Sequence, residues 1–193
     1  MSSLGRILSI SFNCNYTRAD PKKAGLHTSL AVDKSAHDIN SAVALADIEY
    51  FKDAALTVTK SDRFAMHMLG VDGAGNEVVV NAQGSRTIPR PKEGQKGTYR
   101  DTVGISFEQG EISLDAQAGT MVIHRSGQES IFVHRPSLAT NYDQQFLALN
   151  QHWLECVRGE AEPRISRRAT LLSALAIVAL EQAPPNTLID IRV

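Results

Sequence analysis

Alternating apolar and polar residues predict that the chain begins with a half-buried strand. From residue 7 to residue 16 the even positions hold Leu, Ile, Phe, Cys and Tyr, while the odd positions after the first hold only Ser and Asn. A period of two residues is typical of a strand with one buried face. Pro21 and Gly25 favour a loop over residues 17–29. The apolar run from Ala42 to Ala46 then favours a helix with Asp33 near its start.

Short apolar runs separated by turn residues fill the middle of the chain. Glycines at 73, 75, 110, 119 and 127 punctuate them, as expected of turns between antiparallel strands. The predicted strands are residues 56–59, 65–69, 78–80, 103–107, 112–114, 121–123 and 130–133. Residues 84–101 are rich in Gly, Pro, Lys and Arg and predict an exposed loop.

The last third of the chain has helical spacing. Residues 143–158 carry an apolar stripe that includes Phe146 and Trp153, which we interpret as core residues, and Gly159 fits a C-cap. Ser166 fits the N-cap of a helix that runs through Glu181 and is apolar on most sides, which predicts burial against a sheet. After two prolines, residues 187–191 favour a final strand.

These elements predict an α+β fold, with a large open, mainly antiparallel sheet and helices packed on one face. The 193 residues fit a single domain, 1–193. Because the helices cover only one side, the other face is available for dimerisation, and we expect a homo-oligomer through it.

Composition excludes several classes of function. A formal net charge of −1 gives no electrostatic case for nucleic acid binding. Cys14 and Cys156 are too few for a disulfide framework, and we expect buried free thiols. The longest apolar stretch, 171–180, is too short to span a membrane, and the N-terminus lacks a signal-peptide pattern, so we expect a cytoplasmic protein.

The strongest candidate chemistry is the pair Asp33 and His37. In a helix, residues four apart share a face, and a carboxylate beside an imidazole can orient the ring and raise its basicity. The alternatives without a functional role are an exposed, solvated pair, or an Asp33 that only interacts with the helix dipole. The six histidines show no His-x-x-x-His or His-x-His spacing, so no metal site is expected.

Three segments, in order, carry a resemblance to a known family: Gly5-Arg6-Ile7 entering the first strand, Asp33-x-x-x-His37, and Cys156-Val157-Arg158-Gly159 with Pro163. Together they resemble the C-terminal, substrate-binding and oligomerisation domain of the Gfo/Idh/MocA oxidoreductases. The resemblance implies a small-molecule substrate of the sugar or cyclitol type, with Asp33 and His37 as an acid–base pair. It also implies a dimer contact through the open sheet face.

The departure from that family concerns the cofactor. The chain has no G-x-G-x-x-G, and the glycines at 70, 73 and 75 predict a hairpin turn with no helix after it. We therefore expect the chain alone to bind no cofactor, and NAD(P) to act only if a separate dinucleotide-binding subunit or domain completes it. The alternatives are a stand-alone cofactor-independent proton-transfer enzyme (isomerase, lyase or cyclase), a small-molecule binder, and a protein that binds a partner through the sheet face.

Overall fold

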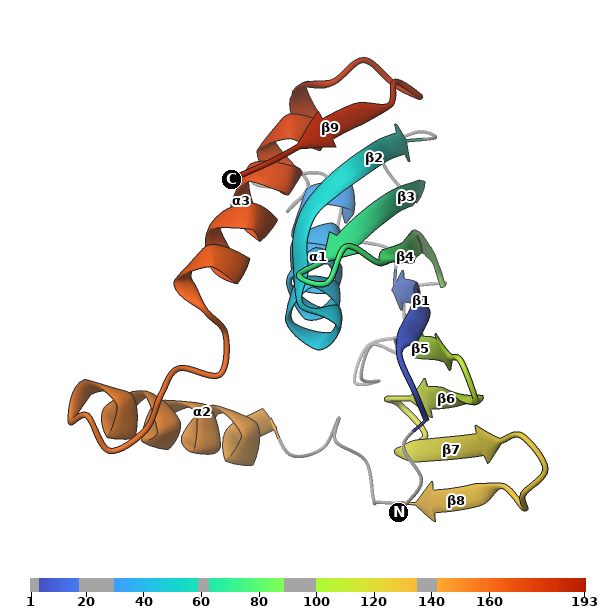
Figure 1. Cartoon of the computed structure of the whole chain (residues 1–193), viewed down its shortest axis with the longest axis vertical. Coiled ribbons are helices and arrows are strands. Elements are labelled where there is room, and N and C mark those ends of the chain that lie inside the picture. The colour runs from blue at the N-terminus through green and yellow to red at the C-terminus, as the bar shows by residue number, and fades with distance from the viewer. Residues whose placement is uncertain (1–3, 18–29, 59–62, 89–99, 135–141) are drawn as a thin grey trace.

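The structure, a computed structural model, describes residues 4–17, 30–58, 63–88, 100–134 and 142–193. The elements are β1 (Ile7–Thr17), α1 (Leu30–Ala46), β2 (Ile48–Val58), β3 (Arg63–Asp72), β4 (Glu77–Ile88), β5 (Arg100–Phe107), β6 (Gly110–Asp115), β7 (Thr120–Arg125), β8 (Ile131–His134), α2 (Tyr142–Val157), α3 (Arg167–Gln182) and β9 (Ile189–Ile191). Figure 1 shows the strands side by side in one twisted sheet, with the helices on one side of it.

The nine described strands form one sheet in the order β8-β7-β6-β5-β1-β4-β3-β2-β9. Only the β1–β4 pair is parallel, and the other pairs are antiparallel. Parallel neighbours need a crossover connection, and here α1 with β2 and β3 supplies it. The predicted α+β class with an open, mainly antiparallel sheet is confirmed.

The core lies between α1, α3 and the half of the sheet that contains β1 to β4. The alternation in β1 has the predicted effect: Ile10, Phe12 and Cys14 are buried toward the helices, whereas Ser11 and Asn13 lie on the opposite face. The buried cluster joins residues of the two helices to five strands: Ile10, Phe12, Cys14, Ile39, Ala42, Val43, Ile48, Phe51, Ala54, Phe64, Met66, Met68, Val78, Val80, Ala82, Leu172, Ala176, Leu180 and Ile191.

A close approach beside Cys14 requires glycine at position 84. A Cβ on Gly84 would lie 2.6 Å from the Cys14 sulfur and would also collide with the Phe64 ring. Because interiors are close-packed, neither neighbour has room to withdraw. β1, β3 and β4 are thus packed closely together at this point of the sheet.

Local capping signals are confirmed at both later helices. The Ser166 hydroxyl accepts a hydrogen bond from the Ala169 amide at 3.0 Å, as an N-cap should. Gly159 has a positive φ of 73° and its amide donates to the Cys156 carbonyl, which ends α2. The β3–β4 connection over the glycines at 73 and 75 is a hairpin turn, as predicted.

Two expectations need correction. Residues 84–88 belong to β4 and residues 100–101 to β5, so the predicted 84–101 loop is shorter, and its remainder, 89–99, lies outside the described residues. Trp153 is not a core residue, because it is 61% exposed on α2. The side chain of Phe146 lies outside the described part. The final strand is confirmed as β9.

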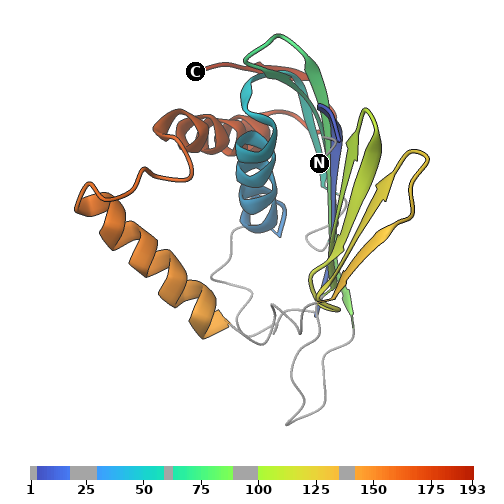
Figure 2. The same ribbon diagram turned by 60° about the horizontal axis from the view of Figure 1, so that its bottom comes forward.

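Helix α2 stands apart from the sheet. Figures 1 and 2 show it across a gap from α1 and α3, joined to α3 by the segment around Pro163. Helix α3 is apolar on most sides, as predicted, but its buried residues, Leu172, Ser173, Ala176 and Leu180, lie on one face, so the expected burial holds for that face only. In the part of the chain that the structure describes, no helix is long and apolar enough to cross a membrane.

Candidate functional site

The predicted pair Asp33 and His37 lies on α1. The helix spans both residues, so their positions share one face, one turn apart. The buried positions of α1, which include Asp38, Ile39 and Ala42, face the sheet, and His37 is exposed on the opposite side. The side chain of Asp33 lies outside the described residues. The His37 side chain is therefore exposed on the face of α1 that points away from the sheet.

Lys34 and Asp38, which flank His37 on α1, belong to a largely buried ion cluster that the sequence analysis did not identify. The Lys34 ammonium lies 3.0 Å from Asp38 Oδ1 on the next turn of α1 and 2.9 Å from Asp101 Oδ2 on β5. The three side chains are 11%, 2% and 20% exposed, respectively. Asp38 Oδ2 and Asp101 Oδ1 are buried and make no hydrogen bond within the described part of the chain. Within the part of the chain that the structure describes, one ammonium is thus paired with two carboxylates.

The burial of this cluster changes its titration. Burial raises the pKa of Asp38 to about 6, against the opposing effect of the Lys34 ammonium. For Lys34, burial by itself lowers the pKa, but the Asp38 charge and the hydrogen bonds to both carboxylates raise that pKa above its ordinary value. Lys34 therefore stays protonated at neutral pH and does not act as a base. Burial also raises the pKa of Cys14 to about 12, which keeps this thiol neutral and inert.

The described residues do not fit a metal or a dinucleotide. Among them no group of three or more His, Cys, Asp or Glu side chains could hold a metal ion. The glycines at 70, 73 and 75 lie in β3 and its hairpin with β4, which is not the strand–turn–helix unit that cradles a pyrophosphate.

The open face of the sheet carries uncharged polar side chains over its centre. Asn13 accepts a hydrogen bond from Gln83, the Ser85 hydroxyl donates to Asn15 at 2.5 Å, and His67 lies 2.7 Å from Asn81. These side chains interact across neighbouring strands, so each already has a polar partner on this face of the sheet. Two hollows lie on this face, one lined by residues that include Asn13 and Arg63 and the other by residues that include Ser11 and His67.

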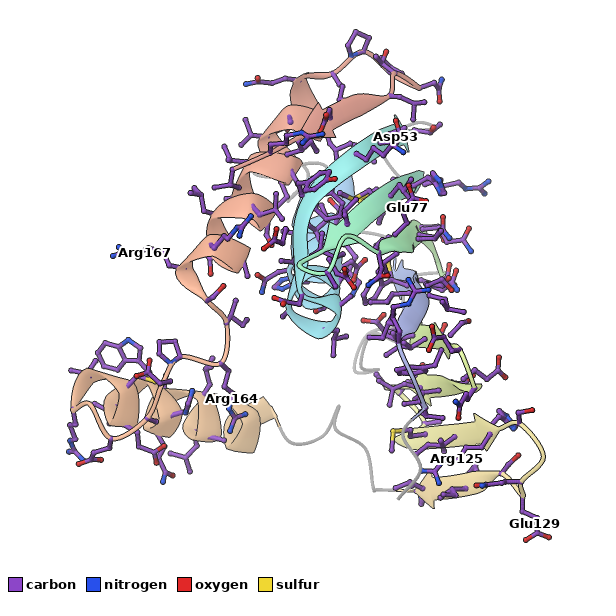
Figure 3. All side chains as sticks on the ribbon, in the orientation of Figure 1. Asp53, Glu77, Arg125, Glu129, Arg164 and Arg167 are labelled. Carbon is purple, nitrogen blue, oxygen red and sulfur yellow. The ribbon has the colours of Figure 1, made fainter. Side chains whose placement is uncertain are left out.

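Helix α2 and the segment after it form an apolar groove of about 640 Å³, lined by residues that include Leu149, Trp153 and Ile165. Figure 3 shows Arg164 lying over α2 at this place. His152 lies within the groove, 3.6 Å from the Cys156 sulfur. Cys156 is a free thiol of intermediate burial, so the predicted buried free thiol is confirmed fully only for Cys14.

Solved structures that match this arrangement of elements include several dehydrogenases. A levoglucosan dehydrogenase in complex with NADH and levoglucosan matches with a TM-score of 0.71 at 13% identity, over 97% of this chain and 60% of its own. The UDP-N-acetylglucosamine 3-dehydrogenase of Acidithiobacillus ferrooxidans matches with a TM-score of 0.67 at 17% identity, over 92% of this chain and 55% of its own. A dehydrogenase from Chromobacterium violaceum matches with a TM-score of 0.65 at 12% identity, over 92% and 53%.

The fold is that of the C-terminal domain of Gfo/Idh/MocA dehydrogenases. The resemblance noted in the sequence is thereby confirmed at the level of the fold. This chain spans only 53% to 60% of the length of these proteins, and the matched part excludes their Rossmann domain. No protein-family model and no curated protein matches the chain.

Part of the missed cluster had a signal in the sequence. Lys34 and Asp38 are an oppositely charged pair four residues apart, and Asp38 sits beside Ile39 on the stripe that leads to Ala42. That position predicts a buried carboxylate that needs a partner. Asp101 had no such signal, because it meets Lys34 only through the pairing of β5 with β1.

Proposed function

We propose that this chain is the substrate-binding half of an NAD(P)-dependent dehydrogenase that acts on a hydroxyl of a sugar or cyclitol. The observation that carries the proposal is the exposed His37 on the outer face of α1, within the fold of sugar dehydrogenases. His37 acts as the acid–base group on the substrate hydroxyl, and Asp33, one turn earlier, orients its ring. Hydride chemistry belongs to a dinucleotide-binding domain or subunit that completes the site.

Exposed apolar side chains on the helix side support such a completing domain. Leu171, Leu175 and Val178 form an exposed stripe on α3, opposite its buried face. Trp153 and Leu149 are 61% exposed on α2. A helix that is apolar all round belongs in the interior of a larger assembly. The matched dehydrogenases have the additional chain length to cover this side, which is also the side that His37 faces.

The isolated chain is expected to bind a sugar or cyclitol weakly and to leave NADH unbound. The substrate face is present on α1, whereas no glycine-rich phosphate turn occurs in the sequence. Calorimetry with levoglucosan, L-sorbose, UDP-N-acetylglucosamine and inositol at millimolar concentration, and with NADH in parallel, measures both. Micromolar binding of NADH by this chain, or no heat from any of the sugars or the cyclitol, would overturn the proposal.

The open sheet face is the proposed homodimer contact. Its centre, around Ser11 and Asn81, is broad, uncharged and free of helices. We expect light scattering at tens of micromolar to give twice the 21.0 kDa mass of one chain. Ser11→Arg should give the monomer, because it places a charge at the centre of the contact, whereas Leu175→Arg on the helix side should leave the mass unchanged. A wild-type monomer would sink the dimer model.

A further inference from the structure

The N-terminal half of α1, which carries His37, has little apolar anchorage among the described side chains. The buried apolar residues of this helix are Ile39, Ala42 and Val43, all on the C-terminal side of His37. Among the described residues the helix packs mainly on α3 and on β2, β3 and β4, with only slight contact to β1. Among the described side chains of α1 before Ile39, the buried ones are polar, Ser35 and Asp38.

Lys34 supplies the interaction at the site end. Its ammonium reaches Asp101, which pairs in register with Cys14 of β1 and lies on the far side of that strand from β4. Neither α1 nor α3 packs substantially on β5. The Lys34–Asp101 contact thus crosses β1 and ties the first turns of α1 to the half of the sheet that these two helices leave uncovered.

The composition of the cluster is poor for stability alone. Two carboxylates and one ammonium are taken out of water, and each carboxylate keeps one oxygen without a hydrogen bond in the described part of the chain. A buried ion group of this kind is weak evidence for stability, since well-packed apolar side chains often do as well, but it fixes a geometry. What it fixes here is the direction of α1 one turn before His37.

We propose that Lys34 and Asp101 are positioning residues for the His37 site: their ion pair holds the N-terminal half of α1 over β1 and β5, with Asp38 fixing the Lys34 side chain from the same helix. The positioning role of this ion pair rests on the proposed function of His37. The tether, which is the Lys34–Asp101 ion pair itself, does not depend on that function, because it concerns only the part of α1 that the ion pair holds in place.

Hydrogen exchange followed by mass spectrometry tests the tether without any substrate. Asp101→Asn keeps the shape of the side chain and removes its charge. We expect it to raise exchange of the backbone amides in residues 30–38 at least tenfold while residues 39–46 and the sheet change little. Lys34→Arg should keep the wild-type pattern, because it preserves the charge. Glu49→Gln is the matched control, since it removes the exposed Arg168–Glu49 pair, another helix–strand contact, of 3.0 Å.

Two outcomes would overturn the inference: unchanged exchange in residues 30–38 of Asp101→Asn, or an equal rise throughout the helix and sheet, which would mark a merely structural role. The sugar affinity of Asp101→Asn is the second readout. A weakening of fivefold or more, restored in Asp101→Glu, supports positioning, and an unchanged affinity contradicts it. If the wild-type chain binds no sugar, the proposed function fails while the exchange result still decides the tether.

Discussion

Lys34→Met is expected to lower the free energy of unfolding by about 3–5 kcal/mol, because removing one partner of a buried ion pair leaves uncompensated charge. Here two carboxylates, Asp38 and Asp101, lose the same ammonium. Urea denaturation at neutral pH measures the change. Lys52→Met is the matched control: its partner Glu77 lies at 3.2 Å, but both side chains are more than half exposed, so only a small loss of stability is expected. A Lys34→Met protein as stable as this control would contradict the account.

The destabilisation caused by Lys34→Met is expected to depend on pH, and its direction follows from the pKa of Asp38. Burial raises the pKa of Asp38 to about 6 in the folded chain, above the ordinary 3.8 of the unfolded chain. Between these values the folded state holds the proton more tightly, so the contribution of Asp38 to stability rises as the pH falls from 7 to 4. Without Lys34 this carboxyl is protonated even more readily. The destabilisation in Lys34→Met should therefore be smaller at pH 5 than at pH 7, and Lys34→Met/Asp38→Asn should recover part of it.

His37→Ala is expected to weaken sugar binding at least tenfold and to abolish turnover in the completed enzyme, with a stability change within about 0.5 kcal/mol. The reason is the position of His37, exposed on the face of α1 that points away from the core. His67→Ala is the matched control, an exposed histidine on the open sheet face beside Asn81. If His37→Ala melts much lower but still binds sugar, His37 belongs to the scaffold instead of the site.

Asp33→Asn separates the roles within the pair. The amide keeps most of the size and hydrogen-bonding capacity of the carboxylate but loses the charge that orients and polarises an imidazole. We expect Asp33→Asn to reduce turnover strongly and sugar binding only mildly.

Local elements were readable from the sequence because their signals are local. The alternation in β1, the Ser166 cap and the Gly159 terminator each depend on a few neighbouring residues, and each is found as predicted. The ends of β4 and β5 do not follow from the sequence, because glycine and basic residues there favour a loop, whereas pairing with β1 and β3 makes them strand.

The remaining features of the fold and the site depend on contacts between segments that lie far apart in the sequence. An apolar stripe predicts that one face of a helix is covered but does not identify what covers it. The stripe on α2 therefore predicts a core position for Trp153, although α2 lies apart from the core. The helix that bears Asp33 and His37 was predictable, and so was half of the ion cluster. The Asp101 contact depends on β5 lying beside β1, an order that no local pattern encodes.

Nuclear magnetic resonance of the histidine rings tests the central claim most directly. The six imidazoles are followed while levoglucosan, L-sorbose, UDP-N-acetylglucosamine or inositol is added to the full chain at millimolar concentration, and His37→Gln assigns the His37 signals. The account predicts a saturable shift of the His37 resonances for at least one of these compounds, with the His67 resonances unmoved. Shifts confined to His67 or to other histidines of the sheet, or no shift of His37 with any of them, would contradict it.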